Sequence, residues 1–97
     1  MTVHEVAPGS AVSDQLALMT AVVAGEIAPP AFGTQWMNAS RRQQRQGERV
    51  GGALGTALND VFFVIEDYGP PDLWEPGDLN DGELVVKVRE ALALLDL

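Results

Sequence analysis

Apolar residues recur along most of the chain at the three- and four-residue spacing of helices, not at the alternate positions of strands. The clearest case begins at the glycines 51, 52 and 55 and ends at Gly69. Its apolar positions follow steps of four, three, four and three, at Leu54, Leu58, Val61, Ile65 and Tyr68. Such a stripe is typical of a helix that packs one side against other helices.

Two helices are expected before this segment. The first runs from about residue 14 to residue 24, after Ser13, with an apolar stripe at Leu16, Met19, Val22 and Val23. Pro29 and Pro30 open the second, because the first turn of a helix does not use the N–H that proline lacks. The apolar stripe of this second helix consists of Phe32, then Trp36 or Met37, then Ala39 or Ser40. It ends where the polar stretch 41–49 begins.

A fourth helix is expected near the end of the chain. It opens at Asn80 or Asp81, and Glu83 follows as in a capping box. Its apolar positions are Leu84, Val88, Ala91, Leu92 and Leu95. The only strand-like runs, 62–65 and 84–86, lie inside longer helical periods. The fold class predicted is therefore all-α, a small antiparallel four-helix bundle, with a flexible N-terminal arm over residues 1–12 and the helical domain over residues 13–97.

Composition narrows the function classes. The chain has 97 residues, no cysteine, and 14 acidic against 6 basic residues, for a net charge of −8. This length fits one domain, and the absence of cysteine excludes disulfides and thiolate zinc sites. An acidic protein repels nucleic acid and anionic membranes, so a basic partner is expected. No segment is apolar for the roughly 20 residues that a membrane span needs, and we expect a cytoplasmic protein.

The acidic residues are concentrated in one part of the sequence. Residues 1–40 carry a charge of −3 and residues 41–49 a charge of +3, so the whole net charge of −8 resides from Asp60 onward. Two interpretations remain open at this point. One is a solvated face that keeps a small protein soluble, and the other is a binding surface.

Motifs for catalysis or ion binding are weak. His4, the only histidine, lies in the predicted arm; residues 51–56 lack the lysine of a phosphate-binding loop; and residues 78–83 do not fit the register of a calcium loop. Glu66 and Asp67 are neighbours on a helix, so they point about 100° apart and form no acid–base dyad. The arginines of stretch 41–49 are interpreted as a solvated helix end. We therefore expect no enzyme, no cofactor and no metal.

The connection 69–79 is rich in proline and acids and contains Trp74. Such a loop can be a binding element, or Leu73 and Trp74 can cover the core of the bundle. The sequence leaves both interpretations open.

The order of these features resembles the family of colicin D immunity proteins over roughly residues 15–97. The first features that carry it are the helix end and turn at 22–28 with Phe32, and Arg41-Arg42 near a helix end. The later ones are the helix and acidic turn at 61–68 with Pro70 and Asp72, and the segment 79–89 before an Ala/Leu-rich terminus.

The resemblance implies a four-helix protein that binds, one to one, the basic C-terminal RNase domain of a tRNA-cleaving toxin. In that family the inhibitor covers the nuclease active site, and its acids stand in for RNA phosphates. The matching positions are Glu66 and Asp72, and the neighbouring acids are Asp67, Glu75 and Asp78.

Two other function classes stay open. One is an adaptor that binds a partner helix through apolar residues such as Trp36, Leu73 or Trp74. The other is a small enzyme or enzyme subunit that uses the acids between residues 72 and 83 with Mg²⁺.

Overall fold

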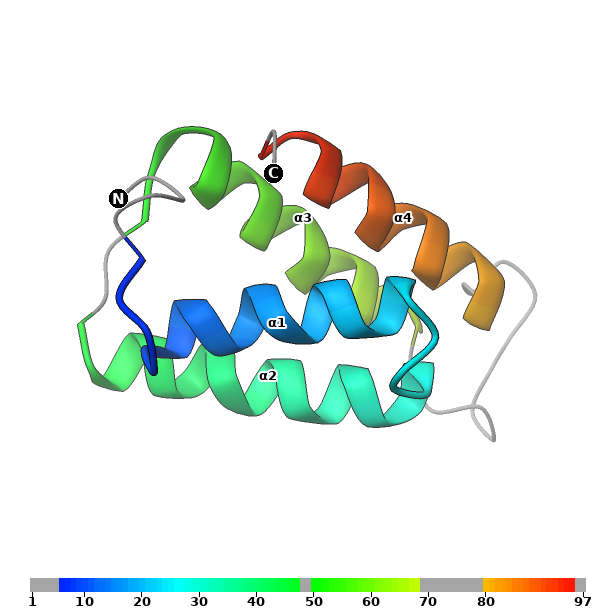
Figure 1. The fold of residues 1–97 in the computed structure, drawn as a ribbon, viewed down its shortest axis with the longest axis horizontal. Coiled ribbons are helices and arrows are strands. Elements are labelled where there is room, and N and C mark those ends of the chain that lie inside the picture. The colour runs from blue at the N-terminus through cyan, green and yellow to red at the C-terminus, as the bar shows by residue number, and fades with distance from the viewer. Residues whose placement is uncertain (1–5, 48–49, 69–79, 96–97) are drawn as a thin grey trace.

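The computed structural model describes residues 6–47, 50–68 and 80–95. These residues form four helices and no strand: α1 (Ala11–Val23), α2 (Pro29–Arg45), α3 (Gly52–Tyr68) and α4 (Asp81–Ala93). Figure 1 shows the arrangement. The all-helical prediction is confirmed, and both strand-like runs lie inside helices.

The helices pack as two pairs. α1 lies beside α2 and runs in the opposite direction, and α4 does the same with α3 (Figure 1). α1 also packs against α4, which brings the pairs together. α2 approaches α3 at Gly33, where an added Cβ would lie 3.6 Å from the Cγ2 atom of Ile65. The small residue lets the two helices meet at this point.

The core consists of one apolar stripe from each helix. All five predicted stripe positions of α3 are buried, and so are Leu84, Val88, Ala91 and Leu95 at the C-terminal end. Phe32 and Trp36 of α2 are the largest aromatic side chains in this core, at 0% and 1% exposure. Because burial of an aromatic side chain of this size contributes several kcal/mol, α2 is anchored mainly by these two rings.

The prediction for α1 was wrong at its start. The helix begins at Ala11, three residues earlier than expected, and Ala11 and Val12 are fully buried. These two residues of the predicted arm therefore belong to the helix, while residues 1–5 lie outside the described residues. The physical reason is Ser10, whose side chain accepts a hydrogen bond of 3.1 Å from the backbone N–H of Ser13 and so caps the helix.

The buried stripe of α1 also differs from the predicted one. It consists of Ala11, Val12, Gln15, Met19 and Val22, whereas Leu16 and Val23 are only partly buried. Met19 and Val22 are buried as predicted, whereas in the first half of the helix the polar residue Gln15 is buried in place of Leu16.

The other helix ends follow the sequence signals. Pro29 and Pro30 occupy the first turn of α2, and Asn80 caps α4 by accepting a hydrogen bond of 2.9 Å from the backbone N–H of Glu83. α2 ends at Arg45, inside the arginine stretch, with Arg42 and Arg45 in its last turn. Cations at this position are favourable because the C-terminal end of a helix carries partial negative charge.

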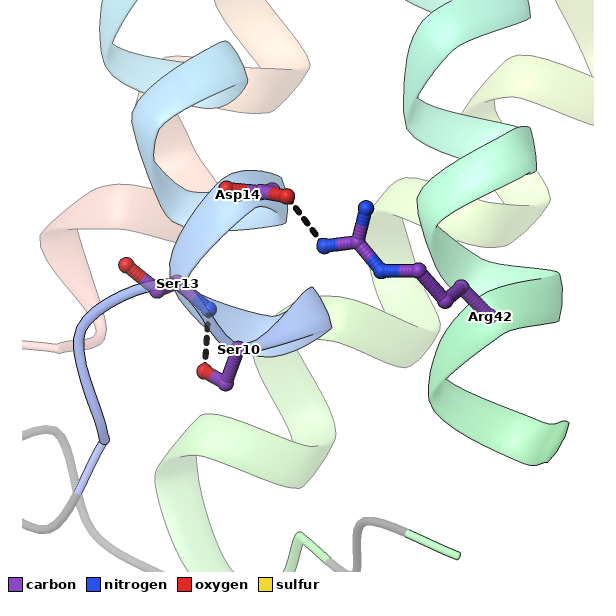
Figure 2. A network of polar contacts seen from close by, with 4 residues as sticks. All are labelled: Ser10, Ser13, Asp14 and Arg42. Atoms are coloured by element: carbon purple, nitrogen blue, oxygen red, sulfur yellow. Dashed lines mark hydrogen bonds and ion pairs between the residues drawn. The ribbon is translucent and has the colours of Figure 1, made fainter. Parts of the chain in front are cut away.

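An ion pair joins α1 to α2. Arg42, in the last turn of α2, donates to the carboxylate of Asp14 in the first turn of α1 (Figure 2). Both side chains are more than a third exposed, so the pair contributes at most about 1 kcal/mol and mainly aligns the two helices. In the described part of the chain, no helix has the length and apolar character required to cross a membrane.

The cap of α1 can be tested with a matched pair of variants. Ser10→Ala should lower the free energy of unfolding by about 1 kcal/mol, because the N–H of Ser13 loses its acceptor. Ser13→Ala is the control, since it keeps the donating backbone N–H. Urea denaturation followed by circular dichroism measures both, and equal losses in the two variants would contradict the role assigned to Ser10.

Candidate functional site

The structure describes two of the five acids assigned to the toxin-binding site. Glu66 and Asp67 lie exposed in the last turn of α3. Asp72, Glu75 and Asp78 lie outside the described residues, and so do Leu73 and Trp74. Trp36, which the adaptor interpretation placed on a binding groove, is 1% exposed and belongs to the core. That assignment of Trp36 is therefore wrong.

Asp67 lines an open groove between α3 and α4. The α3 side of the groove is formed by Asp60, Phe63, Val64 and Asp67, and the α4 side by Lys87, Glu90 and Ala91. Residues 60, 63, 64 and 67 recur at helical spacing and therefore share one side of α3. We call this feature the acidic groove.

Phe63 is the most prominent apolar residue of the acidic groove. Its side chain is 54% exposed, although it is a large aromatic residue. It packs edge-on against the partly buried ring of Phe62, with ring centroids 5.8 Å apart and an interplanar angle of 88°. Phe62 packs on the core, so it gives Phe63 a fixed support. An exposed, supported aromatic ring is typical of residues that dominate binding energy at protein interfaces.

Most acids in this part of the molecule lack a cationic partner. The described acids from residue 60 onward are all exposed: Asp60, Glu66, Asp67, Asp81, Glu83 and Glu90. Of these six acids, only Glu90 forms an ion pair with a described residue, Lys87, at 3.9 Å. Asp60 and Asp67, which flank Phe63 by three and four positions, form none with any residue that the structure describes.

Glu66 and Asp67 occupy an unfavourable position for carboxylates. They lie in the last turn of α3, where the helix carries partial negative charge and has no basic residue to offset it. Repulsion there costs a few tenths of a kcal/mol per charge. Helix stability therefore does not explain these acids, whereas a cationic partner would remove the repulsion.

A hydrogen bond holds the ends of α3 and α4 together. The hydroxyl of Tyr68, the last residue of α3, donates to the carboxylate of Asp81, the first residue of α4. Tyr68 is 4% exposed. Burial raises the pKa of the Tyr68 hydroxyl well above its usual range, and the hydrogen bond and the negative charge of Asp81 raise it further. The bond fixes the end of the acidic groove that is nearest to segment 69–79.

The described residues offer little for other chemistry. Across residues 6–47, 50–68 and 80–95, no cluster of three or more His, Asp or Glu side chains could hold a metal ion. Arg42 is paired with Asp14, and Arg41 donates to Asn38 over 3.1 Å, so two arginines of the basic stretch bind side chains of the protein itself. The glycine cluster lies between α2 and α3 and in the first turn of α3.

Sequence reasoning assigned no site role to three residues that shape the surface and the interior. Asp60 and Phe63 line the acidic groove, and Gln15 is a fully buried amide. Signals for them were present. Phe63 lies off the apolar stripe of α3, as Phe62 also does, and Gln15 lies on that of α1, three positions after Val12 and four before Met19.

The comparisons with known proteins gave no relative. No protein-family model matches this chain, and no curated protein or solved structure matches it significantly. The resemblance to the colicin D immunity family thus depends on the sequence features alone.

The bond between Tyr68 and Asp81 predicts a specific alkaline behaviour. Tyr68 is the only tyrosine in the chain, so the absorbance of tyrosinate reports on this hydroxyl alone. At pH 11, where an unperturbed tyrosine with a pKa of about 10 is mostly ionised, Tyr68 in the folded protein should remain protonated. Spectrophotometric titration, with circular dichroism to confirm folding, measures this. A midpoint near pH 10 in the folded protein would contradict the assigned burial and bond.

The same shift predicts how stability changes with pH. The folded state binds the Tyr68 proton more tightly than the unfolded state does. Its contribution is therefore complete below pH 10 and is lost as pH rises toward the folded pKa. In Tyr68→Phe this dependence is absent, so the stability advantage of the natural protein should shrink between pH 9.5 and 11.5. Urea denaturation of both proteins across that range measures the difference.

Proposed function

We propose that this protein inhibits a basic protein domain by binding it through the acidic groove. Specifically, we propose an immunity protein that blocks the active site of a tRNA-cleaving nuclease toxin. The observation that carries the proposal is the exposed ring of Phe63 between Asp60 and Asp67, which have no partner among the described residues. The resemblance to the colicin D immunity family supports the class of partner.

Inhibition by this surface needs no catalytic step. A nuclease that holds an RNA backbone presents Lys, Arg or His donors, and carboxylates can occupy the same donors through charge-assisted hydrogen bonds. Asp60, Glu66 and Asp67 supply such carboxylates, while Phe63 supplies apolar area. Opposite charges also accelerate association, up to about 10⁸–10⁹ M⁻¹s⁻¹ at low salt. Fast association is useful for an inhibitor that must stop a toxin before it cuts RNA.

The proposal extends to the rest of the predicted site and to the architecture. Asp72, Glu75 and Asp78 follow α3 in sequence, so they would enlarge the acidic surface beside the groove. The proposed architecture is an antiparallel four-helix bundle, which the opposite directions and the packing of both helix pairs support. The proposed complex is one-to-one and forms in the cytoplasm.

An adaptor that binds a partner helix is the second candidate. It is favoured by the exposure of Val86, at 47%, in addition to that of Phe63. Binding of this kind would depend on apolar contacts and would be insensitive to salt. The flanking carboxylates favour the first proposal, and a salt titration of any complex separates the two.

The direct test first asks whether a neighbouring gene encodes a protein with a basic C-terminal nuclease domain, and then mixes that domain with this protein. If the proposal holds, an equimolar amount of this protein should abolish tRNA cleavage by that domain. A bovine pancreatic ribonuclease assay is the control for specificity and should be unaffected. Undiminished cleavage in the presence of a tenfold excess would contradict the proposal.

Neutralising the acids at the end of α3 should separate stability from binding. The double variant Glu66→Gln, Asp67→Asn should be more stable by about 0.5 kcal/mol, because repulsion at the helix end is removed. Its affinity for the nuclease domain should fall at least tenfold in 50 mM salt and less in 500 mM salt. Urea denaturation and calorimetric titration measure the two effects.

The matched control is Glu26→Gln, compared with the single variant Asp67→Asn, because each removes one negative charge. Glu26 is exposed in the turn after α1, outside the acidic groove, so the variant changes net charge without changing that surface. An equal loss of affinity in Glu26→Gln would show that net charge, and not the position of the acids, governs binding.

Truncation of Phe63 should weaken binding without unfolding the protein. Phe63→Ala should cost at least about 2 kcal/mol of binding free energy, which is typical of an aromatic residue at the centre of an interface. Because Phe63 is 54% exposed, the loss of stability should be small. Leu94→Ala, at 50% exposure and outside the groove, is the control and should bind normally. Normal binding by Phe63→Ala would show that the acidic groove is not part of the interface.

A further inference from the structure

A cavity of about 270 Å³ that is open to solvent lies among α1, α2 and α3, apart from the acidic groove. Its apolar wall includes Val50, Leu58 and Phe62. None of the described residues that line it is charged, and none of them lines the groove between α3 and α4. The cavity exceeds the engineered apolar cavity of about 150 Å³ that binds benzene. It therefore has room for a six-membered ring with one polar substituent.

Two residues in the wall of this cavity have unsatisfied polar atoms. Gln15 of α1 is 0% exposed, and neither its Oε1 nor its Nε2 atom has a hydrogen-bond partner among the described residues. The Nε1 atom of Trp36 on α2, which is 1% exposed, is also unpartnered there. Native proteins pair nearly all buried polar atoms, so a cluster of three that are unpaired requires an explanation.

The unpaired atoms define the chemistry of a complementary ligand. The Gln15 amide offers one acceptor and two donors, and the Trp36 indole offers one donor. A carbonyl next to an N–H complements the Gln15 amide, because the N–H donates to Oε1 of Gln15 while the carbonyl accepts from Nε2 of Gln15. The uncharged lining excludes carboxylates and ammonium groups as favourable ligands.

The side chain of Gln15 can turn to meet such a ligand. Its amide atoms are shielded from solvent in the wall of the cavity, so contact requires rotation of the amide group toward the empty volume. The terminal torsion of glutamine has a broad energy profile, which makes this rotation low in energy. Ser40 and Asn59, which also line the cavity, provide further polar contacts near its wall.

We propose that this cavity binds a small uncharged ring compound that carries a carboxamide or lactam. The ring packs against Leu58 and Phe62, and the amide edge pairs with the amide of Gln15. This binding site does not depend on the function proposed for the acidic groove.

The experiment uses the full chain and benzamide as the probe. In ¹H–¹⁵N spectra, benzamide at millimolar concentration should shift the side-chain amide signals of Gln15 and the indole signal of Trp36 in a saturable way. Trp74→Phe assigns the two indole signals. Toluene matches the ring without the amide, and benzoate adds a charge, so both should bind at least about tenfold more weakly. Absence of saturable shifts at 20 mM benzamide, or equal binding of toluene, would overturn the proposal.

A matched pair of variants tests the role of the amide. Gln15→Met keeps the length of the side chain, removes the unpaired amide, and should weaken benzamide binding about tenfold while the melting temperature rises. Gln35→Met is the control, because Gln35 is exposed on α2 and does not line the cavity. Unchanged benzamide affinity in a folded Gln15→Met protein would overturn the proposal. If Gln15→Met does not fold, the saturable shifts of Gln15 and Trp36 in the natural protein still decide it.

Discussion

The burial of one stripe of α3 determines where the other features of this protein can lie. Leu54, Leu58, Val61, Ile65 and Tyr68 all face the interior. Because a helix repeats every 3.6 residues, fixing this stripe also fixes what remains outside. Asp60, Phe63 and Asp67 are then turned toward the groove with α4, while Phe62 is turned toward the cavity with α1 and α2. α3 is thus a wall shared by a charged surface and an uncharged cavity.

How well the sequence predicted each helix depended on how apolar its buried stripe is. α3 and α4 have stripes of large apolar residues, and their predicted positions agree closely with the buried ones. In α1 the stripe includes Gln15 and starts with Ala11, so a search for apolar residues moved it toward Leu16 and began it three residues late. The acidic groove was only half predicted. Charge counting found its acids, but periodicity alone does not show that Phe63, and not Phe62, faces solvent.

Negative charges have opposite effects on helix stability at the C-terminal end of α3 and at the N-terminal end of α4, which meet at Tyr68 and Asp81. Asp81 lies in the first turn of α4, where a negative charge is favourable, and it also accepts the hydrogen bond from Tyr68. Glu66 and Asp67 lie in the last turn of α3, where a negative charge is unfavourable. The bond between Tyr68 and Asp81 therefore holds together a helix end that its own acids weaken. Glu66 and Asp67 lower the stability of the helix in which they lie. Acids that serve only solubility could lie at positions without this cost, so the two residues fit a binding surface better than a solubilising one.

Phe62 and Phe63 connect the cavity with the acidic groove. Phe62 lines the cavity, Phe63 lines the groove, and their rings meet edge-on at 5.8 Å. Contact alone does not couple two sites, because coupling requires that each ligand favour the same one of two arrangements of the shared element. Phe62 is partly buried and packs on the core, and a close-packed core resists continuous displacement. A ligand in the cavity would therefore act on the groove most directly by moving the ring of Phe62 to another rotamer.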